Sequence, residues 1–261
     1  MSSVSLAAAP PAPGFVATFA AVYAGQVARA RVVRASLFFV ATLQSLGLVV
    51  LLRGVVDDER VAEKQQVVAG SVVLVIAFVA LNLLAQRFGQ LRAGHGLDYY
   101  AALPVRPAAV VLGIAASYAS FTVPGTVIVA VVGALLYGLP LAHLWVLVPV
   151  VVLGGAALSG LGAAIGLSAR RPELATVCGQ LGMSVVLFLG LVRAERMPAV
   201  LRGVRAVLPS TYAADALAQA LRTDPAYREV WLDLLICGVS GVAALVLATV
   251  AYRRAVGAGR R

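Results

Sequence analysis

One uninterrupted apolar stretch constrains the fold of this chain more than any other feature. Residues 107–169, which are 63 consecutive positions, contain no Asp, Glu, Lys or Arg. A single helix of that length would be roughly 95 Å long, whereas the hydrocarbon core of a bilayer is about 30 Å thick. Two helix breakers, Gly138 and Pro140, lie near the middle of the stretch. We therefore expect the chain to cross a membrane, turn near these residues and cross back.

The composition of the whole chain also indicates a membrane protein. Hydrophobic residues make up 61% of it and charged residues only 12%, against about 25% charged residues in an ordinary soluble domain. The sequence predicts an all-α membrane protein, with one transmembrane domain over residues 14–261 and a disordered tail over residues 1–13 that is not a signal peptide. Six spans are expected, at approximately residues 35–53, 67–86, 107–137, 143–169, 174–192 and 231–252.

The distribution of charge predicts the orientation. If the N-terminus is cytoplasmic, the connections on that side hold more Arg residues than the outer ones, and only Asp98 and Glu173 of the 11 acids. An excess of basic residues marks the cytoplasmic side of a membrane protein. We expect a multi-pass protein of the cytoplasmic membrane with both termini inside. The basic residues flank apolar runs, so they favour membrane lipids over nucleic acid as partners.

Two segments outside the predicted spans are also amphipathic. Residues 14–34 mix aromatic and aliphatic side chains with basic ones, which favours an interfacial elbow helix, although the first span could also simply begin early. Residues 193–233, before the last span, carry several charges, each costing about 2.5–3.5 kcal/mol at the centre of a membrane helix. We expect this segment to form short helices that lie at the outer surface or dip into it.

Several kinds of chemistry find no support in the sequence. The apolar runs contain no Asp, Glu, Lys or Arg, the kind of residue that usually binds a coupling proton or sodium ion. No phosphate-binding Gly-x-x-x-x-Gly-Lys-Ser/Thr motif occurs. We predict no catalytic, cofactor-binding or metal-binding residue, and no enzyme activity. Energy for any transport would come from a separate subunit.

Three amides stand out inside the predicted spans, namely Gln44, Asn82 and Gln180. They could line a translocation path, or they could form hydrogen bonds between helices, and the sequence leaves both readings open. The string of small residues at 154–166 favours close helix packing in lipid.

The connection over residues 87–107 is long for a turn between spans. It mixes basic residues with an aromatic patch, Tyr99 and Tyr100, which suits a surface that contacts another protein. A lipid-facing loop is the alternative.

Two sequence patterns lie outside the apolar runs. The first, in the 87–107 connection, contains Arg92, Leu97, Asp98, Pro104 and Val105. The second is the Leu-Pro-x-x-Tyr-x-x-Asp-Ala-Leu stretch over residues 208–217. Together they resemble the patterns of the ABC-2 type permeases, the membrane subunits of a class of ABC exporters. Leu91 and Ala93 stand where the family pattern has acids, and His95 and Gly96 replace its Gly-Thr pair.

The resemblance implies an elbow helix, six spans, a cytoplasmic coupling helix that docks on an ATPase, and an outer cap before the last span. The implied coupling residues are Gln90, Leu91, Arg92, Leu97, Asp98, Tyr99, Tyr100, Leu103 and Pro104. The implied outer cap contains Leu208, Pro209, Tyr212 and Asp215.

The resemblance also implies partners and a function. The chain would be the permease of an ATP-driven exporter, paired with a second permease copy in a homodimer or related heterodimer. ATP and Mg²⁺ would bind the separate ATPase, and this chain would bind no cofactor. The charge-free interior suggests a hydrophobic or amphipathic cargo such as a drug, antibiotic or lipid. The alternative function is a non-transporting structural or assembly subunit of a membrane complex.

Overall fold

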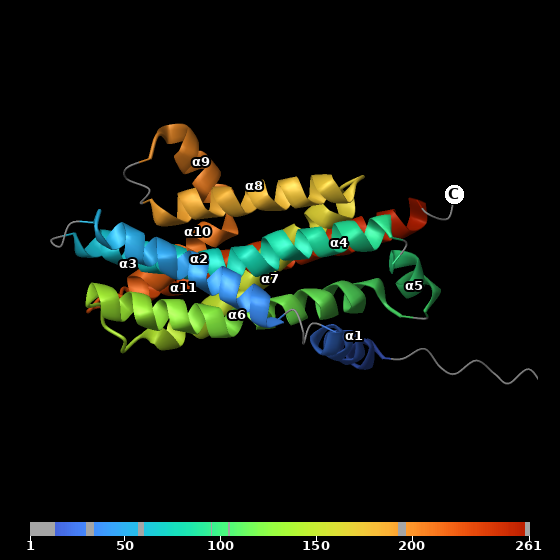
Figure 1. Ribbon diagram of the computed structural model, residues 1–261, viewed down its shortest axis with the longest axis horizontal. Helices are drawn as coiled ribbons and strands as arrows, with labels where there is room; N and C mark the ends of the chain where they lie inside the picture. Colours follow the sequence, from blue (N-terminus) through green and yellow to red (C-terminus); the bar gives the residue numbers. More distant parts are fainter. Residues whose placement is uncertain are drawn as a thin grey trace, which may run out of the picture.

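The computed structural model describes residues 14–29, 34–56, 60–94, 96–103, 105–192 and 197–258. Every regular element in these ranges is a helix. The predicted tail over residues 1–13 and the coupling residue Pro104 lie outside the described residues. Long helices run side by side along the longest axis of the molecule (Figure 1).

The helices follow one another in simple order. Helix α1 (Phe15–Arg29) precedes α2 (Arg34–Arg53), and α3 (Val61–Ile76) continues through the π-helix η1 (Ala77–Leu83) into α4 (Leu84–Ala93). The remaining elements are α5 (Gly96–Ala102), α6 (Pro107–Tyr137), the 3-10 turn η2 (Leu144–Val146), α7 (Leu147–Ser168), α8 (Pro172–Leu191), α9 (Ala199–Val207), α10 (Pro209–Ala220) and α11 (Tyr227–Ala258).

Among the described residues, five helical segments are long and apolar enough to cross a membrane. They are Val61–Ala93, Pro107–Tyr137, Leu144–Ser168, Pro172–Leu191 and Tyr227–Gly257, and Phe38–Arg53 is a shorter apolar helix at the first predicted span. The all-helical membrane class is therefore confirmed. The count of six spans stays a prediction.

The long apolar run reverses where its glycine and proline predict. Helix α6 ends at Tyr137, and Gly138 adopts a left-handed conformation with φ 65°. The Leu139 N–H then donates to the Ala134 carbonyl at 2.8 Å, which satisfies one of the unpaired carbonyls at the end of the helix. Glycine suits this position because an L side chain would be strained there.

The rod formed by α3, η1 and α4 is the centre of the bundle. In the most apolar part of this rod, 89% of the residues are buried within the protein, against 28% in the most apolar part of α11. The small-residue string on α7 packs against this rod, since a Cβ added at Gly162 would lie 2.5 Å from the Leu81 carbonyl oxygen. These close backbone contacts explain why small residues occur at 154–166.

The segment before the last span forms two short helices that differ in burial. Helix α9 is mostly exposed and stands off the bundle, but α10 packs against α3, α7 and α11 and most of its residues are buried (Figure 1). It can be buried because it carries a single charge, Asp215, which is paired with Arg205 of α9.

Candidate functional site

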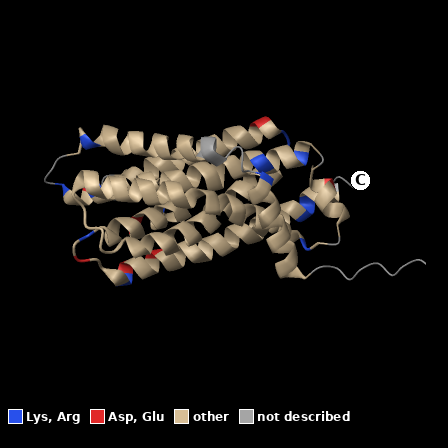
Figure 2. Cartoon of the chain, turned by 60° about the horizontal axis from the view of Figure 1, so that its bottom comes forward, with Lys and Arg blue, Asp and Glu red and all other residues tan. Residues whose placement is uncertain are grey.

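Most charged residues of the bundle lie near its two ends (Figure 2). We call them the α5 end and the α9 end. The α5 end carries residues 96–103, 105–107 and 168–172 and the last described turns of α11, and the α9 end carries residues 53–56, 60–61, 137–146 and 197–227. The middle of the long helices is nearly free of charge. This arrangement is the one that a bilayer requires of a protein that spans it.

At the α5 end, the predicted coupling residues separate into an exposed set and an anchored set. Asp98, Tyr99 and Leu103 are exposed, with Tyr99 67% and Leu103 40% accessible. Leu97 is buried beside Leu91, and both belong to the core cluster at this end. Gln90, in the last turns of α4, is exposed.

Tyr100 and Arg92 face the bundle instead of its surface. The Gln26 side chain of α1 donates from its amide nitrogen to the Tyr100 hydroxyl at 3.2 Å, so α5 is tied to α1. Arg92 donates from Nη1 to the carbonyl oxygens of Leu167 at 2.6 Å and Ala169 at 3.0 Å. It thus caps the end of α7, where helix carbonyls lack intrahelical donors.

Helix α1 lies across the bundle. Figure 1 shows α1 almost end-on while the long helices run horizontally. It packs mainly on α6, and Tyr23 donates to the Ser120 hydroxyl at 3.1 Å. This crossing direction is the geometry expected of a helix at a membrane interface.

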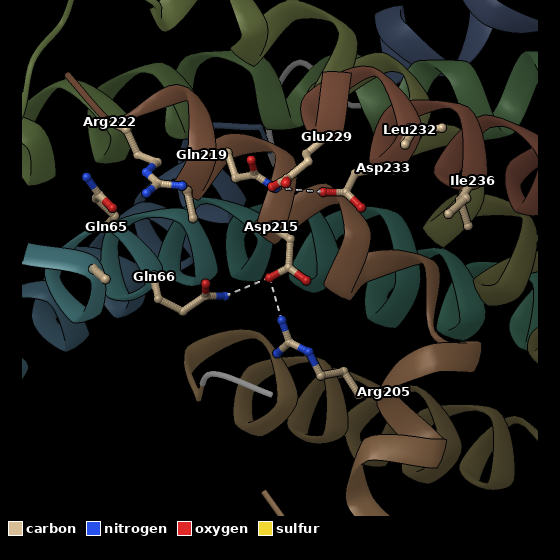
Figure 3. Close-up of a pocket in the computed structure, with 12 residues that line it drawn as sticks. Gln65, Gln66, Arg205, Asp215, Gln219, Arg222, Glu229, Leu232, Asp233 and Ile236 are labelled. Carbon is tan, nitrogen blue, oxygen red and sulfur yellow. Dashed lines mark hydrogen bonds and ion pairs between the residues drawn. The ribbon is translucent and has the colours of Figure 1, made fainter. Parts of the chain in front are cut away.

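At the α9 end, three helices meet at one carboxylate, and the two residues that bind it also contact a fourth helix (Figure 3). Asp215 of α10 accepts hydrogen bonds from the Arg205 guanidinium of α9 and from Gln66 of α3. Arg205 also donates to the Leu189 and Val192 carbonyls at the end of α8, while Gln66 donates to Gly190 of α8 at 2.8 Å. Arg205 is only 6% exposed, so its charge is neutralised inside the protein.

A cavity of about 570 Å³ adjoins this cluster. Gln219, Asp233 and Glu229 line it together with the cluster residues, and Gln219 donates to Asp233 at 3.5 Å (Figure 3). Of the predicted cap residues, Pro209 is buried, Leu208 is half-buried, and the Tyr212 hydroxyl donates to the Ala206 carbonyl at 2.8 Å. The cap residues therefore hold α9 and α10 in place more than they cover a surface.

The three amides predicted in the spans do not form one group. Asn82, in η1, is buried and donates to Gln180 of α8 at 3.2 Å, while Gln86 of α4 donates to Asn82 at 3.0 Å. Gln44 is exposed on α2 and has no hydrogen bond in the described part of the chain. Two of the three thus meet in an interhelical amide cluster that also includes Gln86.

Sequence reasoning missed Arg205, Gln66 and Asp233 at the α9 end. Arg205 and Asp215 are ten residues apart on different helices, so no helical spacing links them. One available signal was the pair Gln65 and Gln66 at the edge of an apolar run, since amides entering a membrane helix need partners. Within the described ranges, no group of three His, Cys, Asp or Glu could hold a metal ion.

The all-helical bundle, its membrane-length helices and its charge-poor middle define a multi-pass membrane protein. The family model described as ABC-2 family transporter protein matches residues 38–250, so the chain belongs to that family. The family consists of membrane transport subunits that normally work with an ATPase subunit. No curated protein gave a significant match.

Proposed function

We propose that this chain is the permease subunit of an ATP-driven exporter and that α5 is the element on which the ATPase acts. The carrying observation is the exposed face of α5, where an aromatic and an apolar side chain, Tyr99 and Leu103, are accessible beside Asp98. Exposed aromatic residues rimmed by charge are typical of protein interfaces. The family normally works with an ATPase subunit, which favours that kind of partner. In this proposal ATP and Mg²⁺ bind to the ATPase and not to this chain.

The contacts behind α5 support a route for movement. Leu97 anchors α5 to the end of α4, and Tyr100 joins it to α1 through Gln26. Tyr100 and Tyr252 of α11 also line one small cavity. A force on the exposed face of α5 would therefore reach α1, α4 and α11 together. Such a force shifts the protein between inward-open and outward-open states only if the ATPase contacts differ between them.

The cargo is proposed to be hydrophobic or amphipathic, moving past the amide cluster of Asn82, Gln86 and Gln180. Gln180 is exposed on α8 although it lies within a candidate span, and a polar group facing lipid is costly. A second permease copy or a water-filled passage on that side would remove this cost. In this arrangement both termini are cytoplasmic. Helix α2 also crosses the membrane, as the first of six spans in chain order, and α1 is the elbow helix at the inner surface.

The test is co-purification of the tagged protein with an ATPase from its native membrane. We expect the Tyr99→Ala/Leu103→Ala double variant to lose the ATPase while keeping normal insertion, because both side chains are exposed and support no core. The matched control is Tyr227→Ala, since Tyr227 is 39% exposed at the α9 end.

Three results would speak against the proposal. Equal loss in both variants would mean that α5 is not the docking element. Retention of the ATPase in the double variant would mean the same. Recovery of other membrane proteins but no ATPase, in detergents that preserve known complexes, would favour a structural or assembly subunit.

A further inference from the structure

A second cavity lies at the α5 end, on the side of the bundle where α4, α7 and α11 meet. Its volume is about 550 Å³. Two arginines, Arg92 and Arg254, line it together with apolar side chains that include Leu167, Leu247, Val250 and Ala251. No acidic residue of the described ranges lines it. The cavity is thus basic at one side and aliphatic at the other.

Both guanidinium groups remain able to bind an anion. Neither Arg92 nor Arg254 forms an ion pair with any described carboxylate. Within the described residues, Arg92 uses only Nη1 in hydrogen bonds, to the Leu167 and Ala169 carbonyls. Its Nε and Nη2 donors are left over, and Arg254 is exposed. The planar donor fork of arginine matches the oxygens of a phosphate.

The position of the two arginines sets the depth of the site. Arg92 lies at the end of the candidate span Val61–Ala93, and Arg254 lies near the end of the span Tyr227–Gly257. These are the positions where helices leave the hydrocarbon and meet lipid headgroups. One and two turns further into α11, Val250 and Leu247 are 38% and 57% exposed. An occupant therefore meets positive charge at headgroup depth and aliphatic surface below it.

We propose that this cavity binds one anionic phospholipid, with its phosphate between Arg92 and Arg254 and an acyl chain along Leu247 and Val250. A phosphate ion satisfies only the basic half of the cavity, whereas a phospholipid satisfies both halves. A zwitterionic lipid brings its own ammonium group toward two arginines, so an anionic headgroup fits better. The proposal requires only that the chain resides in a membrane, and it does not rest on a transport function.

Such a lipid would join three helices. Arg92 belongs to α4 and also caps α7, while Arg254 belongs to α11. The lipid would hold their ends together directly beside α5, which follows α4. Its loss would loosen the α5 end without touching the α9 end.

The chain offers a matched control one residue away. Arg253 is exposed like Arg254 but lines a separate cavity of about 290 Å³ with Tyr100, Leu103 and Tyr252. Arg253→Gln and Arg254→Gln remove the same charge from the same turn of α11. They differ only in which side of the helix loses it.

The experiment measures lipid binding by the full-length, delipidated protein in detergent micelles, with native mass spectrometry and thermal stability as readouts. The probes are phosphatidylglycerol, phosphatidylcholine and inorganic phosphate. We expect one phosphatidylglycerol to bind in preference to phosphatidylcholine. Arg254→Gln should lower its affinity about tenfold, because a charge-assisted hydrogen bond is lost. Arg253→Gln should change it less than about twofold.

Three results overturn the proposal. Equal losses in the two variants would show a diffuse basic surface instead of a site. Equal binding of both lipids would remove the headgroup preference. A thermal shift with inorganic phosphate as large as that with phosphatidylglycerol would show an anion site that needs no acyl chain. Arg254→Lys, which keeps the charge but loses the donor fork, should give an intermediate affinity.

Discussion

At the α9 end of the bundle the key charges face one another, whereas at the α5 end they face outward. Arg205 is 6% exposed and binds Asp215 and two carbonyls of α8, while Arg253 and Arg254 are exposed and form no ion pair among the described residues. Tyr99 and Leu103 are likewise exposed at the α5 end. The α9 end thus buries its ion pair, whereas the α5 end presents exposed polar and aromatic groups beside the inward contacts of Arg92 and Tyr100.

Because of this contrast, mutations at the two ends should affect different properties of the protein. Removing one partner of a buried ion pair leaves an uncompensated charge, whereas removing an exposed charge leaves water or lipid headgroups in its place. Substitutions at the α9 end should therefore lower the free energy of unfolding, and those at the α5 end should alter binding instead.

The largest effect should come from Arg205→Met. Asp215 would keep the Gln66 amide but lose its ionic partner, and the Leu189 and Val192 carbonyls would lose a donor. Because the Asp215 side chain is 31% exposed, we expect a cost of about 3 kcal/mol in the free energy of unfolding, the lower end of the range for a buried ion pair. Reversible unfolding by SDS in mixed micelles measures it. Arg202→Met on the exposed face of the same helix is the control and should cost less than about 0.5 kcal/mol. Equal effects at the two positions would show that the buried pair has no special role.

The double variant Arg205→Met/Asp215→Leu sharpens the same point. It removes both charges, so it should be more stable than Arg205→Met alone. If it is less stable by the sum of the two single effects, the two residues are not coupled in the folded protein.

A smaller effect is expected in the middle of the bundle, at Gly162→Ala. The new Cβ would lie 2.5 Å from the Leu81 carbonyl oxygen, so α7 and the central rod must move apart, at a cost of about 1–3 kcal/mol. Gly47→Ala is the control, because a Cβ there meets nothing within 4 Å and alanine favours the helix by up to about 1 kcal/mol. Thermal unfolding in detergent should move in opposite directions for the two variants.

The amide cluster should contribute less again. A double-mutant cycle of Asn82→Ala and Gln180→Ala should give a coupling energy of about 0.6 kcal/mol, and at most about 1.7 kcal/mol. The same cycle with Gln44→Ala in place of Gln180→Ala should give zero within error, since Gln44 is exposed on another helix. A measurable coupling energy between Asn82 and Gln44 would contradict the separation of Gln44 from the amide cluster.

The smallest change in stability is expected at the α5 end, for Tyr99→Ser. Its side chain is 67% exposed, so the free energy of unfolding should change by less than about 0.5 kcal/mol. SDS unfolding of this variant beside Arg205→Met tests the comparison directly. A loss as large as that of Arg205→Met would mean that both ends are held by internal contacts.

Hydropathy alone was enough to predict the helical membrane fold and the turn near Gly138, because lipid requires long apolar helices and a glycine marks the reversal. It was not enough for the central rod. The sequence predicts a span over residues 67–86, but the helical segment runs from Val61 to Ala93. At its beginning, Gln65 and Gln66 are buried because they donate to carbonyls at the ends of distant helices. Those partners are more than 120 positions away in the chain, so no local pattern reveals them.

The candidate sites were less predictable for the same reason. The 87–107 connection could be singled out by its composition, but not which side chains face outward. Arg92, which the family pattern placed in the coupling segment, caps α7 across 75 positions of sequence. The burial of α10 depends on the pairing of Arg205 with Asp215, which only the tertiary fold brings together.

The π-helix η1 changes the direction in which later side chains of the central rod point. Its i→i+5 turn acts like one extra residue, which rotates everything beyond it by about 100° relative to a regular α-helix. The segment Ala77–Leu83 contains no glycine or proline, so its wider turn is imposed by packing against α6, α7 and α8. The orientation of Arg92 toward α7, and with it the direction in which α5 leaves the rod, is thus fixed by a change of helical pitch ten residues earlier in the chain.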